Sequence, residues 1–187
     1  QPDGFVGEIW LQGDNVGRGY WGRSGETEHT FGGRLAATNE AGGHASGAAL
    51  DRTWLRTGDL GFYLEGELYV VGRLADLVIV AGRSHYPHDI EATAASASPL
   101  VRRGYIAAFT VPGEPLERLV IVAERATGTA RADPVAAIAE IRTAVEDRHG
   151  LPVADVRVVP AGSIPRTTSG KLARLACRDA YVAGAFG

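Results

Sequence analysis

A short loop near the end of the chain carries residue types suited to anion chemistry. Residues 163–171 read Ser-Ile-Pro-Arg-Thr-Thr-Ser-Gly-Lys. A phosphate-wrapping P-loop would need glycine at position 165 and serine or threonine after the lysine, but Pro165 and Leu172 stand there. What remains is a flexible, hydroxyl-rich loop that presents Lys171 just ahead of a helix. A lysine ammonium is a point charge with three rotatable donors, which suits an α-phosphate and a carboxylate that crowd together.

The composition also draws attention to this lysine. Of the 19 lysine and arginine residues, Lys171 is the only lysine. A chain that uses arginine for every other cation has kept a compact ammonium here, which supports a special role. The alternative is a solvated lysine that caps the following helix, and the loop alone does not exclude it.

A second candidate is the carboxylate in Arg-Thr-Gly-Asp-Leu-Gly, residues 56–61. We expect Asp59 at a tight turn that leads into a hairpin. There it could satisfy its own backbone as an Asx turn. It could instead accept hydrogen bonds from both hydroxyls of a ribose, as acidic residues do in nucleotide sites.

A third segment runs from Gly72-Arg73 to residues 82–91, Gly-Arg-Ser-His-Tyr-Pro-His-Asp-Ile-Glu. It contains two arginines and two glycines that can adopt unusual backbone angles. It also lies between two predicted domains, where a few residues can absorb a hinge rotation.

The elements that must position these residues change in type near residue 74. Before it, the sequence predicts a strand at residues 5–11, a glycine-rich connection, and a hairpin of residues 61–64 and 67–71 around a Glu65-Gly66 turn. Small polar residues at 40–49 predict a surface loop. Beyond residue 74, strands and helices alternate. We therefore expect two domains, 1–74 and 75–187.

The second domain is predicted to be compact and mixed. Strands are expected at residues 78–80, 105–111, 119–124 and 156–159, with the middle two paired. Helices are expected after Pro87, after Asp133-Pro134 and after Lys171. The helix that Gly150 stops is predicted to bury Val135, Ile138, Ile141 and Val145, and the last helix to carry Leu172, Leu175, Ala176 and Val182 on one face.

Composition excludes several classes of protein. A net charge of −3 without a basic block argues against nucleic acid as a partner. The apolar runs are too short for a membrane span. The five histidines show no ligand-pair spacing beyond His85 and His88, and we expect no metal site there. The single cysteine, Cys177, excludes an internal disulfide, is expected to be buried, and suggests a reducing cytoplasm.

Without an initial methionine, the chain is interpreted as an excised piece of a longer protein.

In this order, the segments resemble motifs of the adenylate-forming superfamily, which includes acyl-CoA synthetases, peptide-synthetase adenylation domains and luciferases. The matching segments are Gly7-Glu8-Ile9-Trp10 with Gly19-Tyr20-Trp21 and Thr30-Phe31, then Thr57-Gly58-Asp59-Leu60, Gly72-Arg73 with residues 82–91, residues 151–160, and Lys171. They cover nearly the whole chain. The fold class implied is α+β: the hairpin-rich end of a large domain, followed by a small α/β carboxy-terminal lid domain.

The resemblance implies roles for particular residues. Asp59, with Thr57 and Gly58, would bind the ribose hydroxyls of ATP, and Arg73 would contact ribose or phosphate. Lys171 would bridge the substrate carboxylate and the α-phosphate. Mg²⁺ and most of the ATP contacts would belong to the family's amino-terminal part, so this chain alone is expected to be inactive.

The resemblance also implies that the small domain rotates between two reaction steps. The family often has aspartate or lysine as the pivot two residues after the arginine, where this chain has Ala75 followed by Asp76. The hinge is therefore assigned to Ala75 or Asp76.

Residues 82–91 look most like the corresponding run of the fatty acyl-AMP ligases, with Ser84 in place of the usual asparagine. That branch implies activation of a fatty acid with ATP and transfer of the acyl group to an acyl carrier protein or polyketide synthase. The alternatives are an acyl-CoA ligase, a peptide-synthetase adenylation domain, and an isolated carrier-docking module without catalysis.

Overall fold

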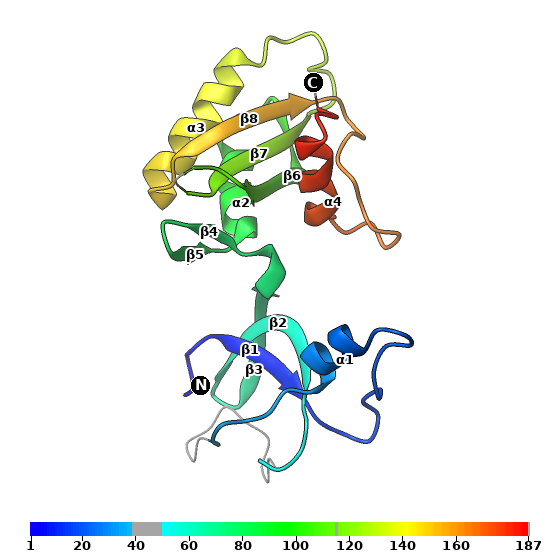
Figure 1. The fold of residues 1–187 in the computed structure, drawn as a ribbon. Coiled ribbons are helices and arrows are strands. Elements are labelled where there is room, and N and C mark those ends of the chain that lie inside the picture. Colours follow the sequence, from blue (N-terminus) through cyan, green and yellow to red (C-terminus); the bar gives the residue numbers. More distant parts are fainter. Residues whose placement is uncertain (39–49, 115, 187) are drawn as a thin grey trace. The chain divides into compact units, whose positions relative to one another are not determined.

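The computed structural model describes residues 1–38, 50–114 and 116–186, and the loop expected at residues 40–49 lies outside them. The chain divides into two compact units, Gln1–Ala75 and Asp76–Gly187 (Figure 1). In the described ranges, none of the helices has the length and hydropathy that a bilayer crossing requires.

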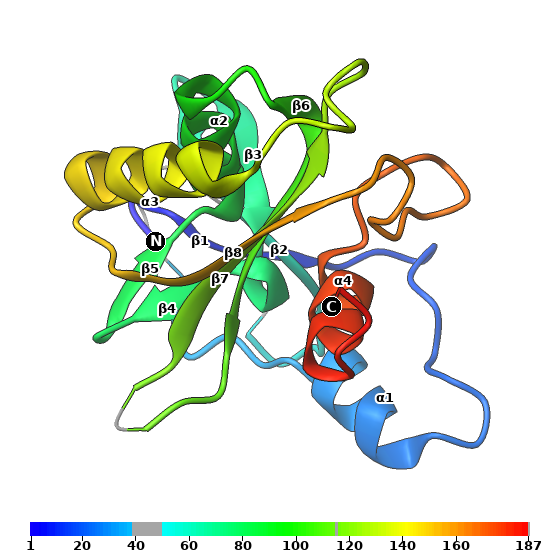
Figure 2. The ribbon, with the colours of Figure 1, turned by 90° about the horizontal axis from the view of Figure 1, so that it is seen from above.

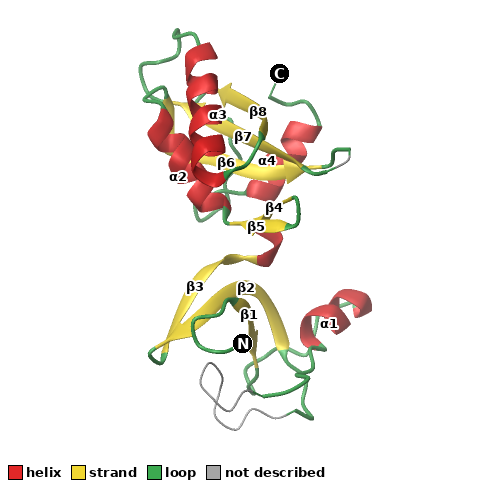
Figure 3. Cartoon of the chain, turned by 90° about the vertical axis from the view of Figure 1, so that its left-hand side faces the viewer, coloured by secondary structure: helices red, strands yellow, loops and turns green. Residues whose placement is uncertain are grey.

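The first unit is built on an antiparallel three-stranded sheet in the order β1-β2-β3, with a helix beside it (Figure 3). Its elements are β1 (Gly7–Leu11), α1 (Ser24–Phe31), β2 (Leu55–Leu64) and β3 (Glu67–Arg73). The predicted hairpin is confirmed. Both turn residues have positive φ, 52° at Glu65 and 82° at Gly66, as a tight two-residue hairpin turn requires.

Helix α1 was not expected, because its sequence lies in a stretch interpreted as a glycine-rich connection. The helix has no buried residue, so it leaves no apolar periodicity in the sequence. Its position depends on a local contact that periodicity does not reveal: Thr27 Oγ1 accepts a hydrogen bond from the Tyr20 backbone N–H at 2.9 Å.

The second unit contains a two-stranded sheet, a three-stranded sheet and three helices. Its elements are a 3-10 turn at Leu74–Asp76 that spans the unit boundary, β4 (Val78–Val80), β5 (Arg83–His85), α2 (Pro87–Ala97), β6 (Val101–Val111), β7 (Arg118–Arg125), α3 (Val135–His149), β8 (Val153–Val159) and α4 (Arg174–Val182). In the larger sheet, β7 pairs antiparallel with β6 and parallel with β8. The predicted pairing of residues 105–111 with 119–124 is confirmed.

The central sheet of this unit is covered on both faces. Helices α2 and α3 lie on one side of it and α4 on the other (Figure 2). Alternate residues of one strand supply the two cores: Ile106 and Ala108 join the α2 and α3 side, while Ala107 and Phe109 join the α4 side. A strand buried on both faces reads as a continuous apolar run, as β6 and β7 do.

Two predicted helix faces are partly wrong. Helix α3 buries Ala137, Ile141 and Val145 and packs Ile138 against the core, whereas Val135, the first residue of the helix, is 67% exposed. Asp133 accepts a hydrogen bond from the Val135 N–H at 3.0 Å. The predicted stop at Gly150 is confirmed, with φ of 65°.

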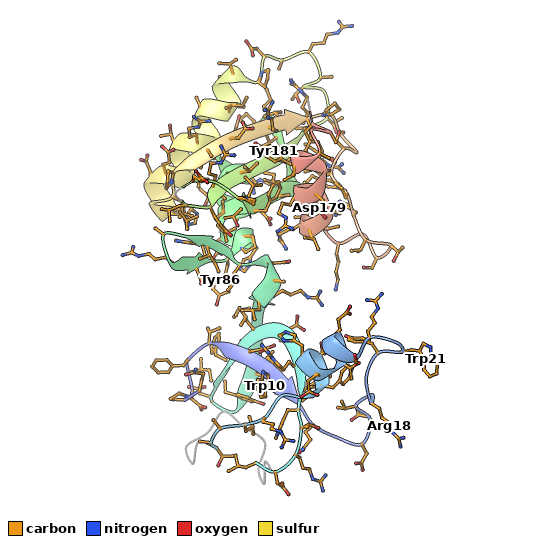
Figure 4. The ribbon with its side chains drawn as sticks, viewed as in Figure 1. Trp10, Arg18, Trp21, Tyr86, Asp179 and Tyr181 are labelled. Atoms are coloured by element: carbon orange, nitrogen blue, oxygen red, sulfur yellow. The ribbon has the colours of Figure 1, made fainter. Side chains whose placement is uncertain are left out.

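Helix α4 is rotated relative to its predicted face. It turns Cys177 and Tyr181, one turn apart, toward the sheet, and leaves Leu175 and Val182 exposed. The Tyr181 hydroxyl donates to Asp155 of β8 at 2.8 Å (Tyr181 is labelled in Figure 4). Burial raises the pKa of the Cys177 thiol to about 12, so this cysteine is a packing residue, as expected.

Candidate functional site

Asp59 lies inside β2, directly opposite Arg73 of β3, and not at a turn. The expected turn is absent, because β2 continues through this position. Gly58 has φ of +71°, but this angle produces only an irregularity within the strand. Arg73 Nε donates to Asp59 Oδ1 at 3.1 Å, with 36% of the Asp59 side chain and 70% of the Arg73 side chain exposed. A carboxylate has about four lone-pair sites. This pair therefore leaves acceptor capacity open to a ligand.

Thr57 and Gly58 hold the backbone before Asp59 against β1. Thr57 Oγ1 donates to the Ile9 carbonyl at 2.7 Å and accepts from the Asp59 N–H at 3.0 Å. The Gly58 N–H donates to Glu8 Oε1 at 3.2 Å. The three residues predicted to act together at a ribose thus form one hydrogen-bonded unit.

Glu8 is the centre of this support, although sequence analysis assigned it no role beyond a motif match. Its Oε2 accepts from the Trp10 indole at 2.9 Å and from Arg56 Nε at 3.1 Å (Trp10 is labelled in Figure 4). Burial by itself would raise the pKa of the Glu8 carboxyl, but hydrogen bonds from Trp10 and Arg56 and the charge of Arg56 outweigh it and lower the pKa. Glu8 therefore stays ionised and fixes Gly58.

Lys171 lies in the connection between β8 and α4, residues 160–173, which we call the lysine loop. The loop was expected to be flexible, but hydrogen bonds close its tip. The Thr167 N–H donates to the Lys171 carbonyl at 2.8 Å, and the Lys171 N–H donates to Thr167 Oγ1 at 3.0 Å. A bridge between Arg166 and Leu172 pairs the two arms of the loop.

The Lys171 side chain is exposed, and its ammonium makes no hydrogen bond or ion pair to any part of the chain that the structure describes. It does not cap the next helix. Helix α4 begins at Arg174 with no side-chain cap, and an ammonium has no acceptor to offer the amides of a helix N-terminus. Because the fold does not use this charge, it is free to bind an anion.

Arg174, three residues after Lys171, anchors α4 to two other elements. Its guanidinium binds both oxygens of Glu91 on α2, at 2.7 and 2.8 Å, and Asp76 at 2.9 Å. Side-chain exposure is only 20% for Arg174 and 13% for Glu91. The hydrogen bonds to Glu91, followed by the charges of Glu91 and Asp76, raise the Arg174 pKa against the opposing effect of burial. Asp76, one of the two hinge candidates, is thereby fixed to the second unit.

Arg174→Ala in the intact protein is expected to destabilise the second unit by about 3–5 kcal/mol, because it leaves two carboxylates without their cation. Hydrogen exchange of the α4 and β6 amides measures this locally and should accelerate. Arg178→Ala is the matched control on the same helix. Its ion pair to Asp179 is 3.5 Å long and exposed, so its removal should change exchange little. Equal exchange in the wild type and the Arg174 variant would contradict the anchoring role.

Within the described residues, no group of three or more His, Cys, Asp or Glu side chains is placed to hold a metal ion.

Comparison with known proteins places this geometry in a family context. No protein-family model matches the chain. It is 47% identical over 99% of its length to long-chain-fatty-acid–AMP ligase FadD32 of Mycolicibacterium smegmatis, covering 32% of that protein. It is 44% identical over 96% of its length to long-chain-fatty-acid–AMP ligase FadD28 of Mycobacterium tuberculosis, covering 30% of it. The putative fatty-acid–CoA ligase fadD21 of Mycobacterium leprae is 49% identical over 96% of the chain, which covers 30% of that ligase. The chain thus spans about a third of the length of these relatives.

Solved structures show the same likeness. A structure from a study of fatty acyl-adenylate ligases of E. coli and L. pneumophila covers the whole chain with a TM-score of 0.72 at 30% identity, and the chain covers 29% of it. The McyG A-PCP structure, complexed with phenylalanyl-adenylate, matches the whole chain with a TM-score of 0.76 at 24% identity, and the chain covers 30% of that structure. At this identity, the likeness supports the fold alone.

In sequence and fold, the chain matches a carboxy-terminal portion of adenylate-forming enzymes. The fatty-acid–AMP ligases FadD32 and FadD28 are among these relatives, and the resemblance and the α+β fold class inferred from the sequence are confirmed.

Proposed function

We propose that the intact protein carrying this chain is a fatty acyl-AMP ligase, which activates a fatty acid with ATP and passes the acyl group to a carrier. The observation that carries the proposal is the ammonium of Lys171, exposed on a hydrogen-bonded loop and not used by the fold, in a chain with 47% identity to a fatty-acid–AMP ligase. The activity belongs to the whole protein, and residues 1–187 alone are expected to be inactive.

The proposed reaction has two steps. First, a carboxylate oxygen of the fatty acid bonds to the α-phosphorus of ATP while the bond from that phosphorus to pyrophosphate breaks, giving acyl-AMP. Lys171 would neutralise the two anions as they approach and stabilise the charge that builds up at the α-phosphate. Next, a thiol attacks the acyl carbonyl, loses its proton and displaces AMP.

The first unit would hold the nucleotide. Asp59, on the support formed by Thr57, Gly58 and Glu8, would accept hydrogen bonds from the ribose hydroxyls, and Arg73 would orient Asp59 and contact ribose or phosphate. Related proteins of known structure include MatB of Rhodopseudomonas palustris, solved with ATP bound.

Ala75 and Asp76 would form the hinge between the two steps. The boundary between the two compact units falls between these residues, and Asp76 is tied to Arg174 within the second unit. Both observations support a backbone rotation next to Ala75. Mg²⁺ would accompany ATP; the described residues contain no cluster of three or more His, Cys, Asp or Glu side chains that could hold it, and no step of this proposal passes through a metal held by this chain.

The acceptor is proposed to be the phosphopantetheine thiol of an acyl carrier protein or polyketide synthase in the cytoplasm. The test supplies the intact protein with fatty acid, ATP, and either free CoA or a phosphopantetheinylated carrier. We expect acyl-AMP without any thiol, acyl-carrier with the carrier, and little acyl-CoA; mass spectrometry distinguishes these products. Acyl-CoA formed as fast as acyl-carrier would favour the CoA-ligase alternative, which the fadD21 relative keeps open. Carrier binding without ATP turnover would favour a docking module.

A further inference from the structure

We propose that Arg166 is a positioning residue for Lys171: it holds the backbone immediately before the lysine in the orientation that the adenylation step needs. This inference rests on the proposed function of Lys171. Arg166 lies five residues before the lysine, and the sequence analysis assigned it no role.

One guanidinium joins the tip of the lysine loop to the central sheet. Arg166 Nη1 donates to the carbonyl of Gly170, the residue before Lys171, at 2.5 Å. Nη2 of the same group donates to the carbonyl of Gly104 in β6. The guanidinium carbon also lies 3.8 Å from the centre of the Tyr105 ring. Arg166 therefore has one partner in the lysine loop and two in β6.

Strand β6 is shaped to receive this side chain. Its pairing with β7 is interrupted between Val101 and Ile106, and Gly104 within the interruption has φ of +74°. A carbonyl in such an irregularity is not committed to the regular ladder and can accept a side-chain donor. Only glycine adopts that backbone angle without strain, so the acceptor depends on the residue type at position 104.

A second guanidinium completes the arrangement. The Arg102 guanidinium carbon lies 3.3 Å from the same Tyr105 ring centre. Two planar groups this close to one ring centre must lie on opposite faces, since on one face they would overlap. The Tyr105 ring is thus held between two guanidinium groups. This arrangement fixes the position of the ring face against which Arg166 packs.

A buried carboxylate ties the base of the loop to the same group. Glu124 of β7 is 1% exposed, and its Oε2 lies 3.7 Å from Arg102 Nη1. Its other oxygen accepts a hydrogen bond from the Ile164 N–H at 3.0 Å. The lysine loop is therefore fixed to the sheet at its base through Glu124 and at its tip through Arg166.

This geometry fits a positioning role better than direct contact with substrate. Both terminal nitrogens of Arg166 already donate to carbonyls of the protein, and the ring covers one face of the guanidinium. The Lys171 ammonium has no described partner that would orient it, so its approach to an anion depends on the backbone at Gly170 and Thr167. A displacement of about 1 Å can cost up to a hundredfold in rate.

Arg166→Ala in the intact protein tests the inference. Acyl-adenylate formation should slow by roughly ten- to a hundredfold in kcat, with little change in KM for ATP or fatty acid. Acyl transfer from preformed acyl-AMP should be unchanged, which also shows that the variant is folded. Arg166→Lys should not restore the rate, because a single ammonium cannot bridge two carbonyls while it stacks on a ring. Arg178→Ala removes an exposed arginine of α4 outside this group and should behave as wild type.

The double variant Arg166→Ala/Lys171→Ala separates this inference from the proposed function. If Arg166 acts through Lys171, the double variant should adenylate no more slowly than Lys171→Ala alone. A full extra loss, a raised KM for ATP, or equal losses in both half-reactions would overturn the positioning role. If Lys171→Ala itself has no effect, the proposed function of Lys171 has failed. If Lys171→Ala abolishes adenylation but Arg166→Ala leaves it intact, only the inference about Arg166 has failed.

Discussion

Lys171→Ala in the intact protein is expected to lower the rate of acyl-adenylate formation by roughly a hundredfold or more. The described structure gives the Lys171 ammonium no internal partner, so its removal should cost little stability. The loss should appear where a carboxylate and an α-phosphate come together, because without the cation their mutual repulsion is not compensated. Pyrophosphate exchange into ATP measures this half-reaction.

The second half-reaction is the internal control for this prediction. Acyl transfer from preformed acyl-AMP should continue, since that step brings no second anion to the phosphate. Lys171→Arg should recover only part of the adenylation rate, because a planar guanidinium cannot occupy the place of a compact ammonium. Arg178→Ala removes an exposed cation from the neighbouring helix and should leave both rates unchanged. Unchanged adenylation in Lys171→Ala would refute the assignment.

Asp59→Ala is expected to raise the KM for ATP by roughly ten- to a hundredfold. This is the second of the two largest effects that we expect, after that of Lys171→Ala. The loss of one hydrogen bond to a charged group costs about 1.5–3 kcal/mol, which corresponds to roughly this change in affinity. Stability should change by less than about 1 kcal/mol, because the partner Arg73 is 70% exposed and the pair is open to solvent. Steady-state kinetics and thermal unfolding of the same variant separate the two effects.

A nucleotide without ribose hydroxyls makes the Asp59 test specific. The wild type should bind 2′,3′-dideoxy-ATP much more weakly than ATP, whereas Asp59→Ala should bind the two nucleotides almost equally. Asp14→Ala, an exposed aspartate in the same unit, is the matched control and should keep the wild-type preference. Retained preference for ATP in the Asp59 variant would show that Asp59 does not bind the ribose hydroxyls and serves only its ion pair with Arg73.

Elements with strong local signals could be predicted from the sequence. The hairpin followed from its Glu65-Gly66 turn, and strands β6 and β7 from continuous apolar runs that the sheet buries on both faces. The end of α3 followed from Gly150, which adopts the left-handed conformation. In each case a few adjacent residues carry the information.

Other elements depend on contacts that adjacent residues do not encode. Helix α1 buries no side chain, so it has no apolar period, and β5 is only three residues long. The face of α4 was misassigned because Leu172 lies before the helix, and Cys177 with Tyr181 makes the contact with the sheet. Short or solvent-exposed elements are set by tertiary contacts and not by pattern.

The candidate site shows the same division. Lys171 and Asp59 could be proposed from residue type and motif spacing, because their predicted roles belong to single side chains. Their supports were not found, since Arg166 reaches a carbonyl 62 residues away and Arg174 a carboxylate 83 residues away. Only the folded chain brings such partners together.

The account depends most on the contact between the Lys171 ammonium and the reacting groups. The most direct test is a structure of the intact protein in its adenylating state, bound to a stable sulfamate analogue of the acyl adenylate. The account predicts Lys171 Nζ at about 3 Å from both the acyl carbonyl oxygen and the group that replaces the α-phosphate. A different cation at that position, with Lys171 far beyond hydrogen-bond distance, would contradict it.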